Sequence, residues 1–405
     1  MGLCYPAVLG SLLQLRDELF SRRAFLAGSA GLMACSHKLA SRYRAWLFMA
    51  SAAEKAVVIS DLANFRRSAS ISLDAAPDQV LYAHGKLYAV CAADQAIVLI
   101  DPALRTITGK IKVGGTIAGT TLTDDGNWLA VATSQPAAVV FIDARSDTII
   151  RRTALPGVPT AISASIEQIA VLLEPTPQSA SSSRLARINL SDGKLIGVSL
   201  VGAGLLSALD YRKDGETIFV AAPDSRQIIS LEAASGAVLA RLPVPIRPAR
   251  FCADGTGGQV FVTGADSEAQ LAIFKPYQNE IDQTLYAGHA LFGMAVAPVR
   301  RYLFLSNPDA GDVTILDIET RRILASVRTG GNPREILVAP SADSTAPEEY
   351  AFVVDGETGD VSVIHIPAVL HNHGDAFIAE PPKPIFAVFH GGTKPQSAVI
   401  VPYAG

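Results

Sequence analysis

The chain has 405 residues, of which 49% are hydrophobic and 18% are charged, and its formal net charge is −4 at pH 7. Such a chain has ample apolar side chains for a core and lacks the positive charge that nucleic-acid binding requires. No run of eighteen uncharged apolar residues is present, so the sequence predicts no membrane-spanning helix.

The first 40 residues are predicted to be an export leader, followed by a single domain over residues 41–405. The sequence SRRAFL at 21–26 opens a short apolar stretch, rich in Gly and Ala, that ends at Ala34. It resembles a twin-arginine export signal, which implies a bacterial protein of the periplasm or cell surface. The alternative is an ordinary amphipathic N-terminal helix with a chance pair of arginines.

Cys35 is the candidate lipidation site. The sequence LMAC at 32–35 resembles a bacterial lipobox, in which a small residue precedes the cysteine that receives the lipid. A lipid at Cys35 would tether the protein to a membrane face without spanning the membrane.

No cofactor is expected from the cysteines. Cys4, Cys35, Cys91 and Cys252 include no C-x-x-C or C-x-x-C-H pair, which argues against zinc, iron–sulfur clusters and covalently attached haem. Cys91 and Cys252 fall in distant repeats, so a disulfide between them is not expected.

From residue 46 onward the chain repeats a hairpin of two β-type runs about every 40–50 residues, as propeller blades do. The second run of each hairpin ends in or near an acidic residue in most repeats. The eight second runs are 56–61, 96–101, 138–143, 184–190, 227–232, 270–274, 312–318 and 360–366.

Two further short apolar segments lie between successive hairpins, which makes four strands per repeat. Turns with positive φ are expected at Asp124-Asp125-Gly126, Lys213-Asp214-Gly215 and Asp254-Gly255. The first repeat lacks its first strand, and residues 397–401 near the C-terminus supply a spare one that would close the ring. The sequence therefore predicts an all-β propeller of about eight four-stranded blades, with seven as the alternative.

Two units of this repeat carry a family resemblance. GGTIAGTTLTDDGNWLAVAT (114–133) and GGNPREILVAP (330–340), together with the V-x-V/I-x-D hairpins, resemble the YVTN β-propeller family. The resemblance covers residue 46 to about residue 400 and implies a propeller of the cell envelope. It does not imply a particular activity, because propellers serve many functions.

No catalytic constellation stands out. The sequence contains no G-x-S-x-G elbow, no H-E-x-x-H motif and no cysteine with a nearby histidine. His371 and His373, with Asp375 nearby, have the ligand types of a metal site. Loop histidines are more often simply solvated, so we predict no metal site.

The mouth of the channel is the expected ligand site, because the loops that join successive blades converge there. Five cationic or imidazole side chains fall on these connections: Arg247, Arg250, His289, Arg334 and Lys394. The loops between the second and third strands of the blades add an acidic rim, formed by Asp94, Glu174, Asp224, Asp266 and Asp309. The alternative is that the arginines cap blade carbonyls or pair with these acids.

These patterns favour a non-catalytic binding or scaffolding module whose partner is a protein, peptide or glycan of the cell envelope. A lactonase-like hydrolase, using acidic and histidine side chains at the mouth and perhaps a divalent metal, is the alternative.

Overall fold

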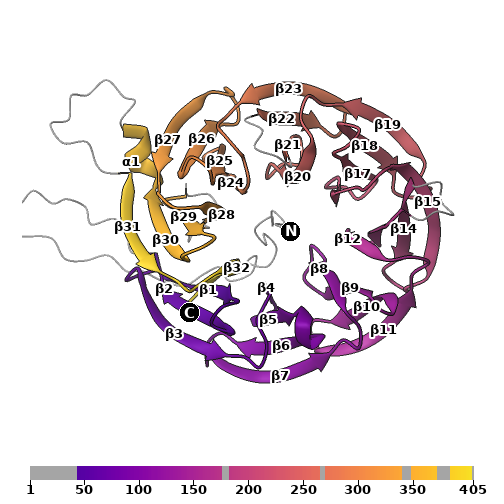
Figure 1. The fold of residues 1–405 in the computed structure, drawn as a ribbon, viewed down its shortest axis with the longest axis horizontal. Coiled ribbons are helices and arrows are strands. Elements are labelled where there is room, and N and C mark those ends of the chain that lie inside the picture. Colours follow the sequence, from indigo (N-terminus) through magenta and orange to yellow (C-terminus); the bar gives the residue numbers. More distant parts are fainter. Residues whose placement is uncertain (1–42, 176–181, 265–269, 340–347, 372–383, 404–405) are drawn as a thin grey trace, which may run out of the picture.

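The computed structural model describes residues 43–175, 182–264, 270–339, 348–371 and 384–403. These residues form eight four-stranded antiparallel sheets in a ring around a central channel, as Figure 1 shows. The prediction of an eight-bladed all-β propeller is therefore confirmed. The predicted leader, with Cys4 and Cys35, lies outside the described residues.

The four strands of each blade follow one another from the channel to the rim, and only blade 1 takes its innermost strand from the C-terminus. The first four blades are made of β32 (Pro395–Pro402), β1 (Ala45–Ser51), β2 (Ala56–Asp61) and β3 (Arg66–Ser72); β4 (Gln79–Ala83), β5 (Lys86–Cys91), β6 (Ala96–Asp101) and β7 (Thr106–Lys112); β8 (Ile117–Leu122), β9 (Trp128–Ser134), β10 (Ala137–Asp143) and β11 (Thr148–Ala154); and β12 (Pro159–Ala164), β13 (Gln168–Leu173), β14 (Ser182–Asn189) and β15 (Leu195–Ala203).

Blades 5 to 8 repeat the same order. They are made of β16 (Ala208–Tyr211), β17 (Thr217–Ala222), β18 (Gln227–Glu232) and β19 (Val238–Pro243); β20 (Pro248–Ala253), β21 (Val260–Gly264), β22 (Gln270–Lys275) and β23 (Glu280–Tyr286); β24 (Met294–Ala297), β25 (Tyr302–Asn307), β26 (Asp312–Asp317) and β27 (Ile323–Arg328); and β28 (Pro333–Val338), β29 (Tyr350–Asp355), β30 (Asp360–His365) and β31 (Ile385–His390). Two short helices, η1 (Ala92–Asp94) and α1 (Ile366–His371), interrupt the pattern.

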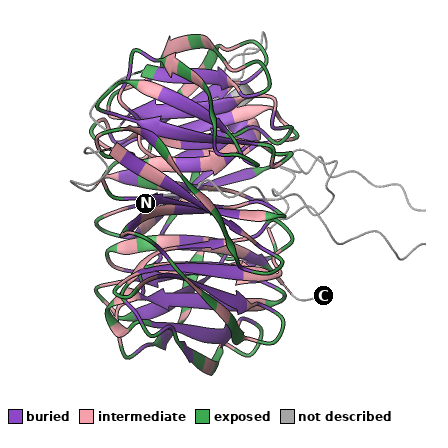
Figure 2. Ribbon diagram, turned by 90° about the vertical axis from the view of Figure 1, so that its right-hand side faces the viewer, coloured by how far each residue is buried: buried purple, intermediate pink, exposed green. Residues whose placement is uncertain are grey.

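The core is divided into layers between the blades. In the described residues the buried apolar side chains form eight clusters, and each cluster joins two neighbouring blades. The second and third strands of a blade are therefore apolar on both faces, whereas an outer strand such as β3 is mostly exposed. Figure 2 shows this as buried strands with exposed loops at the two ends.

Two of the three predicted positive-φ turns are confirmed. Gly126 has a φ of 69° and Gly215 has a φ of 77°, conformations that a side chain with a Cβ rarely adopts. In the third turn the prediction is wrong, because the positive φ, 75°, falls on Gly257 and not on Gly255.

The last strand closes the ring, as predicted. β32 pairs with β1 in antiparallel register, with Val401 opposite Trp46 and Val399 opposite Phe48. Beyond the strand, the Tyr403 ring lies 4.8 Å from the Trp46 ring, centroid to centroid. Both edges of β1 are therefore paired, so β1 offers no free strand edge to which another chain could add.

Cys91 and Cys252 are both buried and lie in different layers of the core, so they do not bond to each other, as expected. In the described part of the chain, no helix is both long and apolar enough to cross a membrane.

The loops gather on two opposite faces. The connections from an outer strand to the next innermost strand, and the loops between second and third strands, lie on one face, which we call the mouth face. The remaining loops lie on the opposite face, because successive strands are antiparallel.

Ring closure makes Val401→Asp strongly destabilising. Val401 is 3% exposed, so the substitution would bury an unpaired carboxylate and lower the free energy of unfolding by at least about 3 kcal/mol. Gln396→Asp, at an exposed position of the same strand, is the control and is expected to change it by less than about 0.5 kcal/mol. Urea unfolding measures both, and equal losses would contradict the packing of β32 in blade 1.

Candidate functional site

Two of the predicted cationic side chains converge at the mouth. The Cζ atom of Arg250, on β20, lies 3.8 Å from the centre of the Phe292 ring, and the Cζ atom of Arg334, on β28, lies 4.7 Å from it. Phe292 belongs to the connection between β23 and β24. Blades 6, 7 and 8 thus meet in one group, Arg250, Phe292 and Arg334, which we call the mouth cluster.

The loop that carries Phe292 is held by hydrogen bonds from its backbone. The Phe292 N–H donates to the Ser306 carbonyl at 3.0 Å, and the Gly293 N–H donates to the Ser306 Oγ at 2.7 Å. A Cβ on Gly293 would lie 2.0 Å from the Arg334 carbonyl oxygen, so only glycine allows this approach. The position of Phe292 is therefore fixed by the backbone around it.

Arg334 is positioned in a similar way. Its Nε donates to the Asn332 Oδ1 at 3.3 Å, and its side chain crosses Gly356, where a Cβ would lie 2.5 Å from the Arg334 Cδ. The backbone N–H of Asn332 in turn donates to a carboxylate oxygen of Asp355. These contacts orient the guanidinium toward the ring before any ligand is present.

The mouth cluster has the chemistry of an anion site. Stacking on a ring leaves the N–H groups of a guanidinium in its plane, in a geometry that matches the two oxygens of a carboxylate or phosphate. An anion bound there would lie near two positive charges, both of which would attract it.

The other three predicted residues do not join the mouth cluster. Arg247 forms an ion pair with Asp224 at 2.9 Å, and His289 hydrogen-bonds to the Tyr286 hydroxyl at 3.0 Å. Lys394 is exposed on the loop before β32. At least one acid of the predicted rim, Asp224, is therefore paired with an arginine. This is the alternative interpretation given above for the arginines.

One more acid of the predicted rim forms ion pairs. Asp94 binds Lys110 and Lys112, at 2.5 and 3.1 Å. Asp266 lies outside the described residues.

Sequence reasoning missed Phe292. The segment GHALFGM at 288–294 has the pattern of another apolar connection between blades. Nothing in it distinguishes a phenylalanine ring at the mouth from one in the core. The one sequence feature that could have indicated its position is the pair of glycines on either side of it, Gly288 and Gly293. Glycines so placed indicate a loop that packs closely against its surroundings.

Two carboxyl groups lie in the wall of the channel. Asp210, on β16, accepts hydrogen bonds from the Ser163 hydroxyl at 3.3 Å and from the Tyr211 N–H at 2.8 Å. Burial raises the pKa of Asp210 to about 6. Glu335, on β28, accepts a hydrogen bond from the backbone of Ala398, and burial raises the pKa of Glu335 to about 7. Each group therefore stays protonated to a higher pH than a free carboxyl does.

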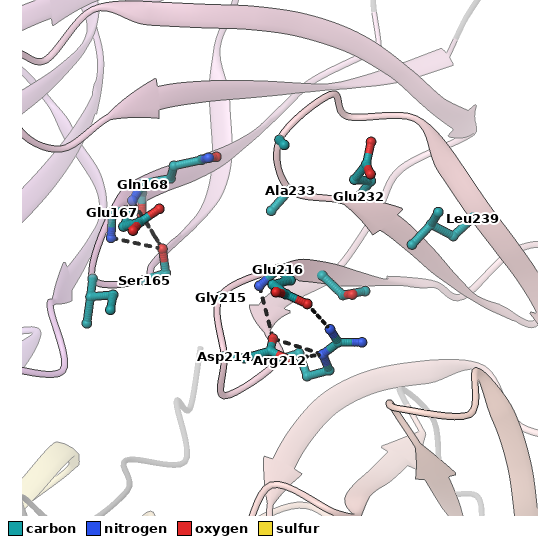
Figure 3. Close-up of a pocket in the computed structure, with 13 residues that line it drawn as sticks. Ser165, Glu167, Gln168, Arg212, Asp214, Gly215, Glu216, Glu232, Ala233 and Leu239 are labelled. Carbon is teal, nitrogen blue, oxygen red and sulfur yellow. Dashed lines mark hydrogen bonds and ion pairs between the residues drawn. The ribbon is translucent and has the colours of Figure 1, made fainter.

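The opposite face carries a pocket of about 610 Å³ between blades 4 and 5. Figure 3 shows Arg212 bound to Asp214 and Glu216, with Glu167 and Glu232 also in the lining. Both ion pairs measure 2.8 Å. The guanidinium is therefore already neutralised, and the pocket is acidic.

The histidines of the last blade do not form a group in the described residues. His390 pairs with Asp360 at 3.1 Å, and the His365 ring packs near those of Tyr350 and Phe386. His373, Asp375 and the side chain of His371 lie outside the described residues. In the described residues no three His, Cys, Asp or Glu side chains are grouped as metal ligands would be.

Known protein families and curated proteins give no match to this sequence. Solved structures match its fold. Dihydro-heme d1 dehydrogenase NirN in complex with DHE aligns with a TM-score of 0.68 and 15% identity, over 87% of this chain and 74% of that one. AztD from Citrobacter koseri aligns with a TM-score of 0.65 and 13% identity, over 89% and 99%. At these identities the likeness shows a shared propeller fold.

The pKa of Glu335 predicts a pH dependence of stability. Between about pH 4.5 and pH 7 the folded protein holds a proton that the unfolded chain releases, so the free energy of unfolding falls as the pH rises through this window. Glu335→Gln keeps a hydrogen-bond acceptor without the charge. The variant is expected to be more stable than the wild type by about 2 kcal/mol at pH 8 and equally stable at pH 4.

Urea unfolding at several pH values measures this difference. Glu167→Gln, at an exposed position of the opposite face, serves as the control and should follow the wild-type profile. Parallel profiles of the wild type and Glu335→Gln would contradict the raised pKa.

Proposed function

We propose that this protein is an exported β-propeller of the bacterial cell envelope that binds an anionic group of a protein, peptide or glycan at its mouth. The observation that carries the proposal is the mouth cluster, in which Arg250 and Arg334 come from two different blades to one phenylalanine ring.

Preorganisation supports a binding role. Phe292 and Arg334 are held by backbone contacts, so a ligand would not have to order these side chains when it binds. Guanidinium–carboxylate pairs are also among the stronger hydrogen bonds in proteins. The structural likeness to NirN, which was solved in complex with DHE, is consistent with a propeller of this shape that takes a ligand.

The location is proposed from the N-terminal sequence. The paired Arg22 and Arg23 with the following Phe25-Leu26 support export, and the box that ends at Cys35 supports a lipid tether. Rigid rings that fold before export suit a route that carries folded proteins.

Binding to the mouth cluster can be measured directly. Isothermal titration with citrate and with a hexaglutamate peptide is expected to show binding to the wild type that Arg250→Ala/Arg334→Ala weakens at least about tenfold, because charge-assisted hydrogen bonds contribute about 1.5–3 kcal/mol each. Phe292→Ala is expected to weaken binding less, since it removes the platform and keeps the charges.

The control is Arg328→Ala, which removes one positive charge from an exposed position of the outer strand β27. An equal loss in this variant, no loss in the double variant, or no binding of either probe to the wild type would contradict the anion site. Turnover of a lactone that is lost in Glu335→Gln would instead favour the hydrolase alternative, with the channel acids as its catalytic groups.

Export can be tested by cell fractionation. In a bacterium with a twin-arginine system, Arg22→Lys/Arg23→Lys is expected to retain the protein in the cytoplasm, whereas the control Arg42→Lys/Arg44→Lys is expected to be exported normally. Cys35→Ser should move the exported protein from the membrane fraction to the soluble envelope fraction. Unchanged export of the first variant would contradict the twin-arginine signal.

A further inference from the structure

The outermost strand of blade 4 differs from the other seven outer strands. Every outer strand exposes a row of backbone N–H and C=O groups, and proteins usually place charged residues there to prevent pairing with another chain. Seven outer strands contain at least one ionisable residue: β3, β7, β11, β19, β23, β27 and β31. β15, with the sequence LIGVSLVGA, contains none, and at nine residues it is the longest.

One side of β15 is also apolar and exposed. Val198 and Leu200 point to the same side because they alternate along the strand, and they are 38% and 62% exposed. Val201 points to the other side and is 1% exposed, packed in the layer that joins blades 4 and 5. The exposed side is thus not part of the propeller's own core.

We propose that β15 is a homodimer interface, in which β15 of one copy pairs antiparallel with β15 of a second copy around a two-fold axis at Ser199. In this register Val198 of each copy lies opposite Leu200 of the other, so the two exposed side chains form a cross-strand pair twice. The eight strands of the two blades then form one continuous sheet.

Charge favours a second copy as the occupant. Two copies of an uncharged strand pair without repulsion, whereas self-pairing of β11 would bring Arg151 and Arg152 of the two copies together. One strand per copy gives a small interface, so the dimer is expected to be reversible, with a dissociation constant in the micromolar range.

Sedimentation velocity over a range of concentrations tests the dimer with the full-length protein. The wild type is expected to pass from monomer to dimer, and Leu200→Lys is expected to raise the dissociation constant at least about tenfold, because symmetry introduces each lysine twice. The control is Val388→Lys on the outer strand β31. The Val388 side chain is 59% exposed, and this variant also replaces an exposed apolar side chain with lysine.

A wild type that stays monomeric at all concentrations would overturn the proposal. So would a dimer that Val388→Lys dissociates and Leu200→Lys does not.

Cross-linking tests the register. In a chain with Cys4 and Cys35 replaced by serine, Val198→Cys and Leu200→Cys are made separately and then mixed under mild oxidation. The mixture is expected to form an intermolecular disulfide between the directly opposite positions. Val198→Cys alone is expected to cross-link far less. In its dimer the two cysteines occupy diagonal positions, about 7–8 Å apart, which is too far for a disulfide. Equal cross-linking of Val198→Cys alone and the mixture, or none in either, would overturn the register around Ser199.

Discussion

The pairing of β32 with β1 is the contact on which the ring depends. Each blade buries both faces of its middle strands against its two neighbours, so an open ring would expose one apolar face on blade 1 and one on blade 8. β32 also contacts both neighbours through polar groups, because the Ser397 Oγ accepts a hydrogen bond from Val80 of blade 2 at 2.8 Å, and Ala398 donates to Glu335 of blade 8. The eight residues of β32 thus complete the layers on both sides of blade 1.

Polar contacts between blades fix the rotation of one blade against the next, which apolar layers alone do not specify. Arginine side chains donate across the blade boundaries to backbone carbonyls, as Arg184 does to Pro156 at 3.2 Å and Arg187 to Ala233 at 3.0 Å. Arg187 is 4% exposed, so its charge is stabilised by carbonyl dipoles inside the protein. Arg184 and Arg187 therefore have a structural role, and a positive charge at the mouth is not by itself a sign of ligand binding.

The mouth cluster differs from these boundary contacts because two guanidiniums from different blades lie against one aromatic ring. Its three residues come from three blades, and the contacts of Gly293 with the Arg334 carbonyl tie blade 7 to blade 8 at this point. The same contacts that join the blades thus hold the site rigid. Loops on such a rigid ring can vary without loss of the fold, which explains why the fold alone does not identify the ligand.

The sequence by itself predicted about eight blades, with seven as the alternative, and the closure of the ring by the C-terminal strand. The second and third strands of each blade are buried on both faces, so they appear as strong apolar runs such as AVVISD at 56–61, and a missing first strand implies a spare one at the end. The partners of the mouth side chains were decided by the tertiary structure alone. Arg247 and Arg250 are three residues apart, yet one pairs with Asp224 and the other stacks on Phe292, because Arg247 lies on the connection before β20 and Arg250 lies within β20. Arg250 and Arg334 are far apart in the chain. They meet only because the closed ring brings blades 6 and 8 to either side of the loop that carries Phe292, and no local sequence pattern predicts that contact.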